Sequence, residues 1–156
     1  MDITLVEEKD IKEILPIILR EFAYTKMNEK KVLRRIHGKN FRIFKAVEAG
    51  KIIGFIELEK LDFDSVRING LSIVPEKRRN GFGKQLIDFA VEFLKKKNIR
   101  RIFLLVRQSN TEAKKLYSEA GFKIVGTEPE KFEGETVEDL ELNLHSEEEE
   151  TPSYIG

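Results

Sequence analysis

The sequence predicts an α/β fold in which helices flank a single mixed β-sheet. From residue 3 to residue 144 the spacing of apolar residues alternates between strand-like and helical. A tight turn at Ala49–Gly50 separates two strand-like segments, which predicts an antiparallel hairpin. A helical segment, 81–97, stands between two apolar strand-like segments, and this order predicts a parallel pair joined by a right-handed crossover. Helices should therefore cover both faces of the sheet.

Three segments are expected before the hairpin. Residues 3–6 have the pattern of a short strand, and Asp10 can cap a helix that runs to about residue 23. Pro16 should bend or break that helix, because proline lacks an amide hydrogen. Asn28 can cap a second, shorter helix that ends near residue 38.

The remaining elements follow from the same patterns. The apolar residues of 81–97 recur on one helical face, and Asn98 is a suitable stop for that helix. The unbroken apolar run 102–106 is typical of a strand buried on both faces. A last helix should run from Asn110 to Gly121. The expected strands are 41–48, 51–60, 66–74, 102–106, 122–127 and 136–144.

Length and composition fit one domain over residues 1–144. A chain of 156 residues holds one ordinary domain, and 40% hydrophobic residues can supply its core. Residues 145–156 are acidic and then polar, so we expect a disordered tail. The absence of cysteine excludes a disulfide framework, a cysteine-based zinc site and a thiol nucleophile, and we expect no metal.

The chain is expected to be cytoplasmic and to have no membrane partner. Its longest uncharged stretch, 68–75, is far shorter than the ~20 residues that cross a bilayer. Four acidic residues, Asp2, Glu7, Glu8 and Asp10, fall within the first ten positions, where a signal peptide would be basic and then apolar. The last strand could pair across a homodimer.

Basic residues are concentrated in the segment 77–101, where nine lysines and arginines face only Asp88 and Glu92. Such a cluster suggests an anionic partner, although a solvated helix face has the same composition. Exposed aromatic residues are not interleaved with the charges, so we expect no nucleic-acid partner.

The segment between the strand 66–74 and the helix 81–97 has the chemistry of a phosphate-binding loop. Gly81 and Gly83 would let an anion approach the free amide groups of the first helical turn. Arg78, Arg79 and Lys84 add full positive charges. The glycine spacing fits neither the P-loop nor the dinucleotide-binding fingerprint, since no glycine stands at position 78 or 86.

Two motifs resemble those of a known family. Arg78-x-x-Gly81-x-Gly83, preceded by Leu71-x-Ile73-x-Pro75, resembles the acetyl-CoA pyrophosphate signature of the GNAT acyltransferase superfamily. The segment Asn110-x-x-Ala113-x-x-Leu116-Tyr117-x-x-x-Gly121-Phe122 is similar to that family's other hallmark. The resemblance covers residues 3–144 and implies a centrally splayed sheet. It also implies transfer of an acetyl group from acetyl-CoA to a primary amine of a protein or small molecule.

The resemblance assigns roles residue by residue. Tyr117 would be the catalytic acid beside the leaving sulfur, and Asn110 would contact the cofactor near the splay. The strand residues Leu71, Ser72 and Ile73 would bind the pantetheine arm and the thioester carbonyl. The pyrophosphate would be bound by Arg78, Arg79, Asn80, Gly81, Phe82, Gly83 and Lys84. A helix cap and a core tyrosine are the structural alternatives for Asn110 and Tyr117.

The resemblance does not identify which residue would act as the general base. The segment 104–110 is similar to the ribosomal-protein alanine N-acetyltransferases, which carry a catalytic glutamate where this chain has Leu105. Glu57, Glu59 and Glu133 are candidate bases, with ordinary surface charge as the alternative for each. Without cysteine, transfer should be direct in a ternary complex. A non-catalytic acyl-CoA-binding module is the alternative function.

Overall fold

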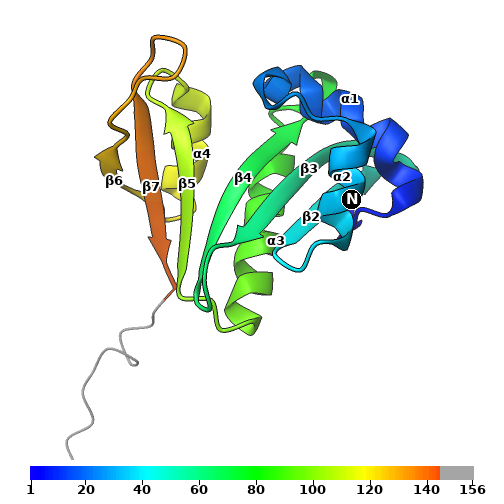
Figure 1. Cartoon of the computed structure of the whole chain (residues 1–156), viewed down its shortest axis with the longest axis horizontal. Coiled ribbons are helices and arrows are strands. Elements are labelled where there is room, and N and C mark those ends of the chain that lie inside the picture. Colours follow the sequence, from blue (N-terminus) through cyan, green and yellow to red (C-terminus); the bar gives the residue numbers. More distant parts are fainter. Residues whose placement is uncertain (145–156) are drawn as a thin grey trace, which may run out of the picture.

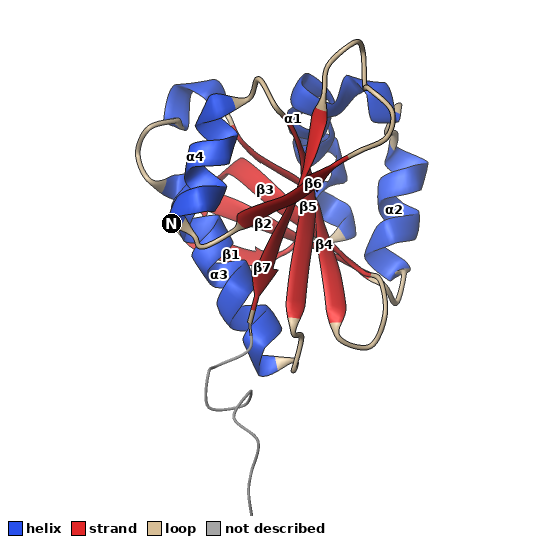
Figure 2. Cartoon of the chain, turned by 90° about the vertical axis from the view of Figure 1, so that its left-hand side faces the viewer, coloured by secondary structure: helices blue, strands red, loops and turns tan. Residues whose placement is uncertain are grey.

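A computed structural model of the chain describes residues 1–144; the predicted tail, 145–156, lies outside the described residues. The described part forms one seven-stranded mixed sheet of order β1-β2-β3-β4-β5-β7-β6. Two helices cover each face of this sheet (Figure 2). The strands are β1 (Asp2–Leu5), β2 (Phe41–Glu48), β3 (Lys51–Lys60), β4 (Ser65–Ile73), β5 (Arg101–Arg107), β6 (Lys123–Thr127) and β7 (Val137–Asn143). The helices are α1 (Ile11–Phe22), α2 (Glu29–His37), α3 (Phe82–Lys96) and α4 (Thr111–Glu119).

The predicted hairpin and the parallel crossover are both confirmed. β2 and β3 pair antiparallel around the turn at Ala49–Gly50, where both residues have a positive φ. β4 and β5 pair in parallel on either side of α3. Asn28 caps α2 by accepting a hydrogen bond from the Lys31 amide at 2.8 Å, as expected. Asn98 adopts the left-handed conformation just after α3.

Four details of the prediction are wrong. The strand β5 is not buried on both faces, because its positions alternate between buried and more exposed. Pro16 does not break α1, because the helix keeps Ile11, Ile14 and Ile18 buried on one face through the proline. The side chain of Asp10 does not cap α1, because it accepts a hydrogen bond from Lys45 instead. The last strand, β7, cannot pair across a dimer, because it lies between β5 and β6 in the sheet. The free edge at that end is β6.

The central parallel pair separates, as the resemblance implied. β4 and β5 are paired only from Ser65 and Arg101 to Ile68 and Leu104. Beyond that point β4 continues to Ile73 without a partner on this side, although β3 still pairs with its other edge. In Figure 1 the two strands meet at one end and diverge toward the other. The sheet thus opens into two halves.

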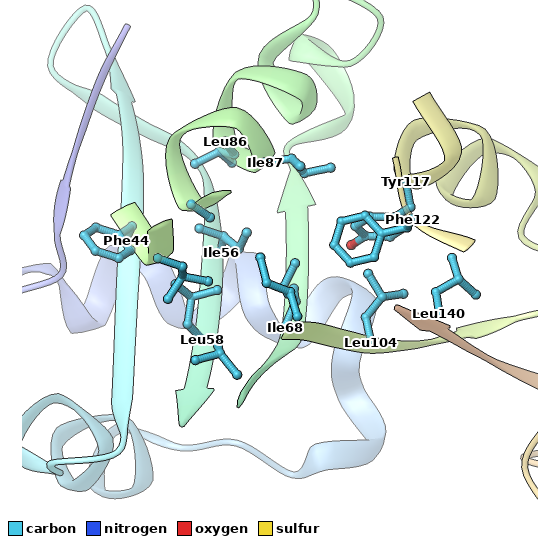
Figure 3. Close-up of a cluster of buried hydrophobic side chains, with 14 of the residues drawn as sticks. Phe44, Ile56, Leu58, Ile68, Leu86, Ile87, Leu104, Tyr117, Phe122 and Leu140 are labelled. Carbon is cyan, nitrogen blue, oxygen red and sulfur yellow. The ribbon is translucent and has the colours of Figure 1, made fainter. Parts of the chain in front are cut away.

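Two apolar cores lie on the two faces of the sheet. The larger core packs α3 and α4 against β3, β4, β5 and β7, and includes Leu86, Leu104 and Tyr117 (Figure 3). The smaller core packs α1 and α2 against β2 and β3 through Ile14, Val32 and Phe55. Each face of the gap between β4 and β5 is therefore bordered by a different pair of helices.

The side chain of Asp10 forms a buried ion pair with Lys45. Its carboxylate accepts hydrogen bonds from Lys45 Nζ at 2.6 Å and from the Glu7 amide at 2.8 Å. Burial opposes ionisation, but these hydrogen bonds outweigh it and hold the pKa of Asp10 below its ordinary value of 3.8. The ionised form therefore stabilises the fold above about pH 4, and that stabilisation is lost as the pH falls through the lowered pKa.

We expect Asp10→Asn to lower the free energy of unfolding at pH 7 by roughly 3 kcal/mol, because Lys45 would remain buried without its counter-ion. Urea denaturation at pH 7 and at lower pH measures this difference, which should narrow as the pH falls through the lowered pKa of Asp10. Glu8→Gln, which removes the exposed pair between Glu8 and His37, is the matched control and should cost less than about 1 kcal/mol. A gap that persists at low pH would contradict the role of the ionised carboxylate.

Candidate functional site

The loop between β4 and α3 presents backbone amide groups at a helix N-terminus. Arg79 and Gly81 both have a positive φ, 64° and 78°, and Gly81 is the N-cap residue of α3. The first hydrogen bond of the helix joins the Gln85 amide to the Gly81 carbonyl at 3.1 Å. The amides of Phe82, Gly83 and Lys84 consequently have no partner within the helix. The helix dipole adds partial positive charge at this point.

Gly81 and Gly83 each lack a side chain for a different structural reason. A Cβ built on Gly81 would meet no atom within 4 Å, so its side of the loop is open space. A Cβ on Gly83 would lie 3.3 Å from Leu116 Cδ2 and 3.9 Å from Leu71 Cδ2, so α3 approaches α4 and β4 closely there. Gly81 thus leaves room for a ligand, while Gly83 allows close packing.

Side chains hold the loop in shape. Arg78 Nε donates to the Ile73 carbonyl at 2.9 Å, and Arg78 Nη2 lies 2.5 Å from the carboxylate of Glu21 on α1. Asn80 Nδ2 donates to the carbonyls of Lys77 and Arg78, each at 3.1 Å. The guanidinium of Arg78 therefore anchors the loop to β4 and α1.

The other two predicted cations are at the surface of the loop. Arg79 is 89% exposed, and its one ion-pair partner within residues 1–144 is Glu112, at 4.0 Å. Lys84 Nζ lies 2.8 Å from Asp88 Oδ2, and this hydrogen bond raises the pKa of Lys84. Arg79 precedes the N-cap residue of α3 and Lys84 belongs to its first turn, so an anion at the free amides would gain from both charges.

Asn110 is the N-cap residue of α4 and Tyr117 lies within that helix, on the other side of the splay. Asn110 caps the helix by accepting a hydrogen bond from the Ala113 amide at 3.2 Å. Tyr117 is 7% exposed and packs edge-on against Phe122, with 5.5 Å between ring centroids. Its hydroxyl makes no hydrogen bond to any described residue, and Figure 3 shows the oxygen on the side of Ile68 and Leu104. Burial raises the pKa of Tyr117, so the phenol stays protonated at physiological pH.

A cleft of about 380 Å³ lies on the opposite face of the sheet, between β3, β4, β5 and the α1–α2 region. Its polar floor is a network on neighbouring strands that includes two of the candidate bases. Glu57 Oε2 accepts hydrogen bonds from Arg35 Nη1 at 2.6 Å and from Asn69 Nδ2 at 2.9 Å. Glu59 Oε1 accepts from Arg67 Nη2 at 3.0 Å and from Asn69 Nδ2 at 2.9 Å.

The third candidate base, Glu133, lies in the connection between β6 and β7. Its carboxylate is 3.1 Å from Arg107 Nη2, and Glu135 pairs with the other nitrogen of the same guanidinium. The ring of Phe132 from this connection contacts Tyr24, with 4.7 Å between centroids. Glu133 therefore braces a loop beside the cleft and does not line the cleft.

The partners of the two floor glutamates were not predicted from the sequence. Arg35 comes from α2, and Asn69 stands at an irregularity where β4 shifts register against β3. Alternate polar positions on two paired strands, 57 and 59 facing 67 and 69, were the available signal for a cross-strand cluster. The arginine from α2 left no signal in the sequence.

The match to a known family defines the class of the protein. Residues 5–144 match the family described as acetyltransferase (GNAT) domain. The chain belongs to this family and is an acetyltransferase. No metal-binding group of three or more suitable side chains occurs in residues 1–144, and no helix in that range has the length and hydropathy of a membrane span.

Named relatives are N-acetyltransferases. The [ribosomal protein bS18]-alanine N-acetyltransferase of Haemophilus ducreyi is 29% identical over 77% of this chain and 81% of its own length. The crystal structure of the ribosomal-protein-S18-alanine N-acetyltransferase from Escherichia coli has a TM-score of 0.81 at 22% identity, over 93% and 94% of the two chains. The PaiA N-acetyltransferase from Thermoplasma acidophilum, solved in complex with coenzyme A, has a TM-score of 0.76 at 21% identity, over 92% and 99%.

Proposed function

We propose that this protein transfers an acetyl group from acetyl-CoA to a primary amine by direct attack in a ternary complex. One observation carries the proposal, namely the gap between β4 and β5. On one side of this gap lie the free amides at the start of α3, which we call the anion cradle, and on the other side lies the cleft. A thioester lying in this gap would be reached from the cleft by an acceptor. The absence of cysteine removes an acyl-cysteine route.

The residues around the gap fit coenzyme A. The open space at Gly81 and the free amides of Phe82, Gly83 and Lys84 suit a pyrophosphate, with charge from Arg79 and Lys84. The backbone of Leu71, Ser72 and Ile73 continues past the last pairing with β5, so it suits an extended pantetheine arm. Arg78 and Asn80 would act through the loop that they hold, and Asn110 from the start of α4.

The chemistry requires a proton for the leaving group. Acetyl-CoA supplies an activated acetyl group whose carbon–sulfur bond breaks as the amine nitrogen forms the new carbon–nitrogen bond. The nitrogen loses a proton, and the departing thiolate must gain one. The protonated hydroxyl of Tyr117, unpaired among the described residues, would donate to that sulfur. Backbone amides near Ile73 would stabilise the carbonyl oxygen as charge develops on it.

A non-catalytic acyl-CoA-binding module is the second candidate. Leu105 stands where the ribosomal-protein enzymes carry their glutamate, and both carboxylates of the cleft are held by arginines. A module would bind coenzyme A with the same loop and would leave the thioester intact.

A thiol-release assay with acetyl-CoA separates the two candidates. The acceptors are peptides, amino acids and polyamines, with mass spectrometry to identify the acetylated nitrogen, and calorimetry measures coenzyme A affinity on the same sample. Amine-dependent thiol release with a matching mass increase supports the transferase. Tight coenzyme A binding with no release above the acceptor-free rate, for every amine tested, would establish the module.

A further inference from the structure

The charges of the cleft floor cancel among themselves. Its only lining carboxylates among the described residues are Glu57 and Glu59, and its only lining cations are Arg35 and Arg67. Each glutamate is in an ion pair with one arginine, at 2.6 Å and 3.0 Å. Asn69 joins the two pairs by donating to both carboxylates. The floor is therefore polar and neutral.

The absence of net charge on the cleft floor favours some classes of amine acceptor over others. A polyamine with several positive charges gains no net attraction from a neutral floor, and a free amino acid finds no unpaired cation there for its carboxylate. Arginines already engage both carboxylates, so the described part of the cleft presents no unpaired carboxylate to an ammonium group, and an amine that is already neutral is favoured. At pH 7 roughly a tenth of an α-amine with a pKa near ~8 is neutral, against less than about one in a thousand for a lysine at ~10.4.

The walls of the cleft are apolar. Leu105 follows the last residue of β5 that pairs with β4 and is 49% exposed, whereas its neighbour Leu104 is buried on the other face. Leu105 thus borders the cleft where the two strands begin to separate. Ile18, Met27, Val32, Ile43 and Phe55 also line the cleft, but these five side chains are buried. The apolar surface of the opposite wall comes from Phe22 at the end of α1 and from Tyr24, which is 51% exposed. An apolar group seated here would exclude water from these surfaces.

We infer that the acceptor is a peptide amino terminus whose first residue has a large apolar side chain, and that Leu105 helps to determine this specificity. The inference rests on the proposed transferase function. The α-amine would lie at the separation of β4 and β5, above the neutral floor. The first side chain would pack against Leu105 and the α1 wall, and the rest of the peptide would leave through the open side of the cleft.

The test compares acceptors that differ in one feature. Peptides identical except for the first residue, Leu, Met, Ala or Ser, are assayed for kcat/KM by thiol release, together with leucine amide, free leucine and spermidine. We expect leucine and methionine peptides to exceed the alanine peptide by about tenfold or more. Free leucine and spermidine should fall below the alanine peptide. A preference for alanine, serine or spermidine would overturn the inference.

Two leucine variants test the residue itself. Leu105→Ser should reduce the ratio between leucine and alanine peptides at least about fivefold, because the apolar wall loses most of its side chain. Leu61→Ser is the matched control, since Leu61 is 46% exposed and lies outside the cleft, and the ratio should not change. An unchanged ratio in Leu105→Ser, with folding verified by circular dichroism, would contradict the assignment. Coenzyme A binding without transfer to any amine would instead overturn the proposed function.

Discussion

Gly81→Glu should abolish acetyl-CoA binding while the fold persists. The new side chain would occupy the open space above the free amides of α3, and its carboxylate would repel the pyrophosphate. We expect the dissociation constant measured by calorimetry to rise at least about a hundredfold, since both the amide contacts and the favourable charge would be lost. Turnover should be lost with it.

Gly50→Glu is the matched control for this substitution. Gly50 also has a positive φ, 76° against 78°, and a Cβ there would meet no atom within 4 Å. Both variants therefore carry the same backbone strain, about 1–2 kcal/mol, but Gly50 lies in the hairpin turn between β2 and β3. An equal loss of affinity in both variants would indicate general destabilisation. Unchanged affinity in Gly81→Glu would refute the assignment of the cradle.

The fold was predictable because its main determinants are local. Apolar periodicity located the strands, and Asn28 and Asn110 mark their helix starts through caps that need only neighbouring residues. The parallel pair followed from the order of elements, since a helix between two strands constrains the connection. The continuation of α1 through Pro16 was not predictable locally, because the burial of one helix face depends on tertiary packing that a local rule does not include.

The phosphate loop could be predicted from the sequence, whereas the floor of the cleft could not. The phosphate loop is one continuous segment, 71–84, so its glycines and cations can be recognised together. The cleft floor instead brings together residues from α2, β3 and β4, and Arg35 pairs with Glu57 across 22 positions. Glu57 and Glu59 look like free bases in the sequence. The structure shows both paired with arginines, which changes the expected chemistry of the acceptor.

Tyr117→Phe is expected to reduce kcat by roughly 10²–10⁴ while acetyl-CoA affinity stays within a few-fold. The substitution keeps the ring that packs against Phe122 and removes only the hydroxyl. Because that hydroxyl has no hydrogen-bond partner among the described residues, its loss leaves no buried group unsatisfied, and stability should change by less than about 1 kcal/mol. Single-turnover measurements separate the chemical step from product release.

Changing the acidity of the leaving thiol distinguishes a catalytic Tyr117 from a purely structural one. If the hydroxyl assists the departing thiolate, the defect of Tyr117→Phe should shrink with acyl donors whose thiols are more acidic, because those thiolates need less help. Since burial raises the pKa of Tyr117, wild-type activity should show no loss from its deprotonation up to about pH 10. Full single-turnover rates in the phenylalanine variant, or a defect that is the same for every thiol, would show that Tyr117 is only a packing residue of the core. The proton for the thiolate would then have to come from water or from the acceptor amine.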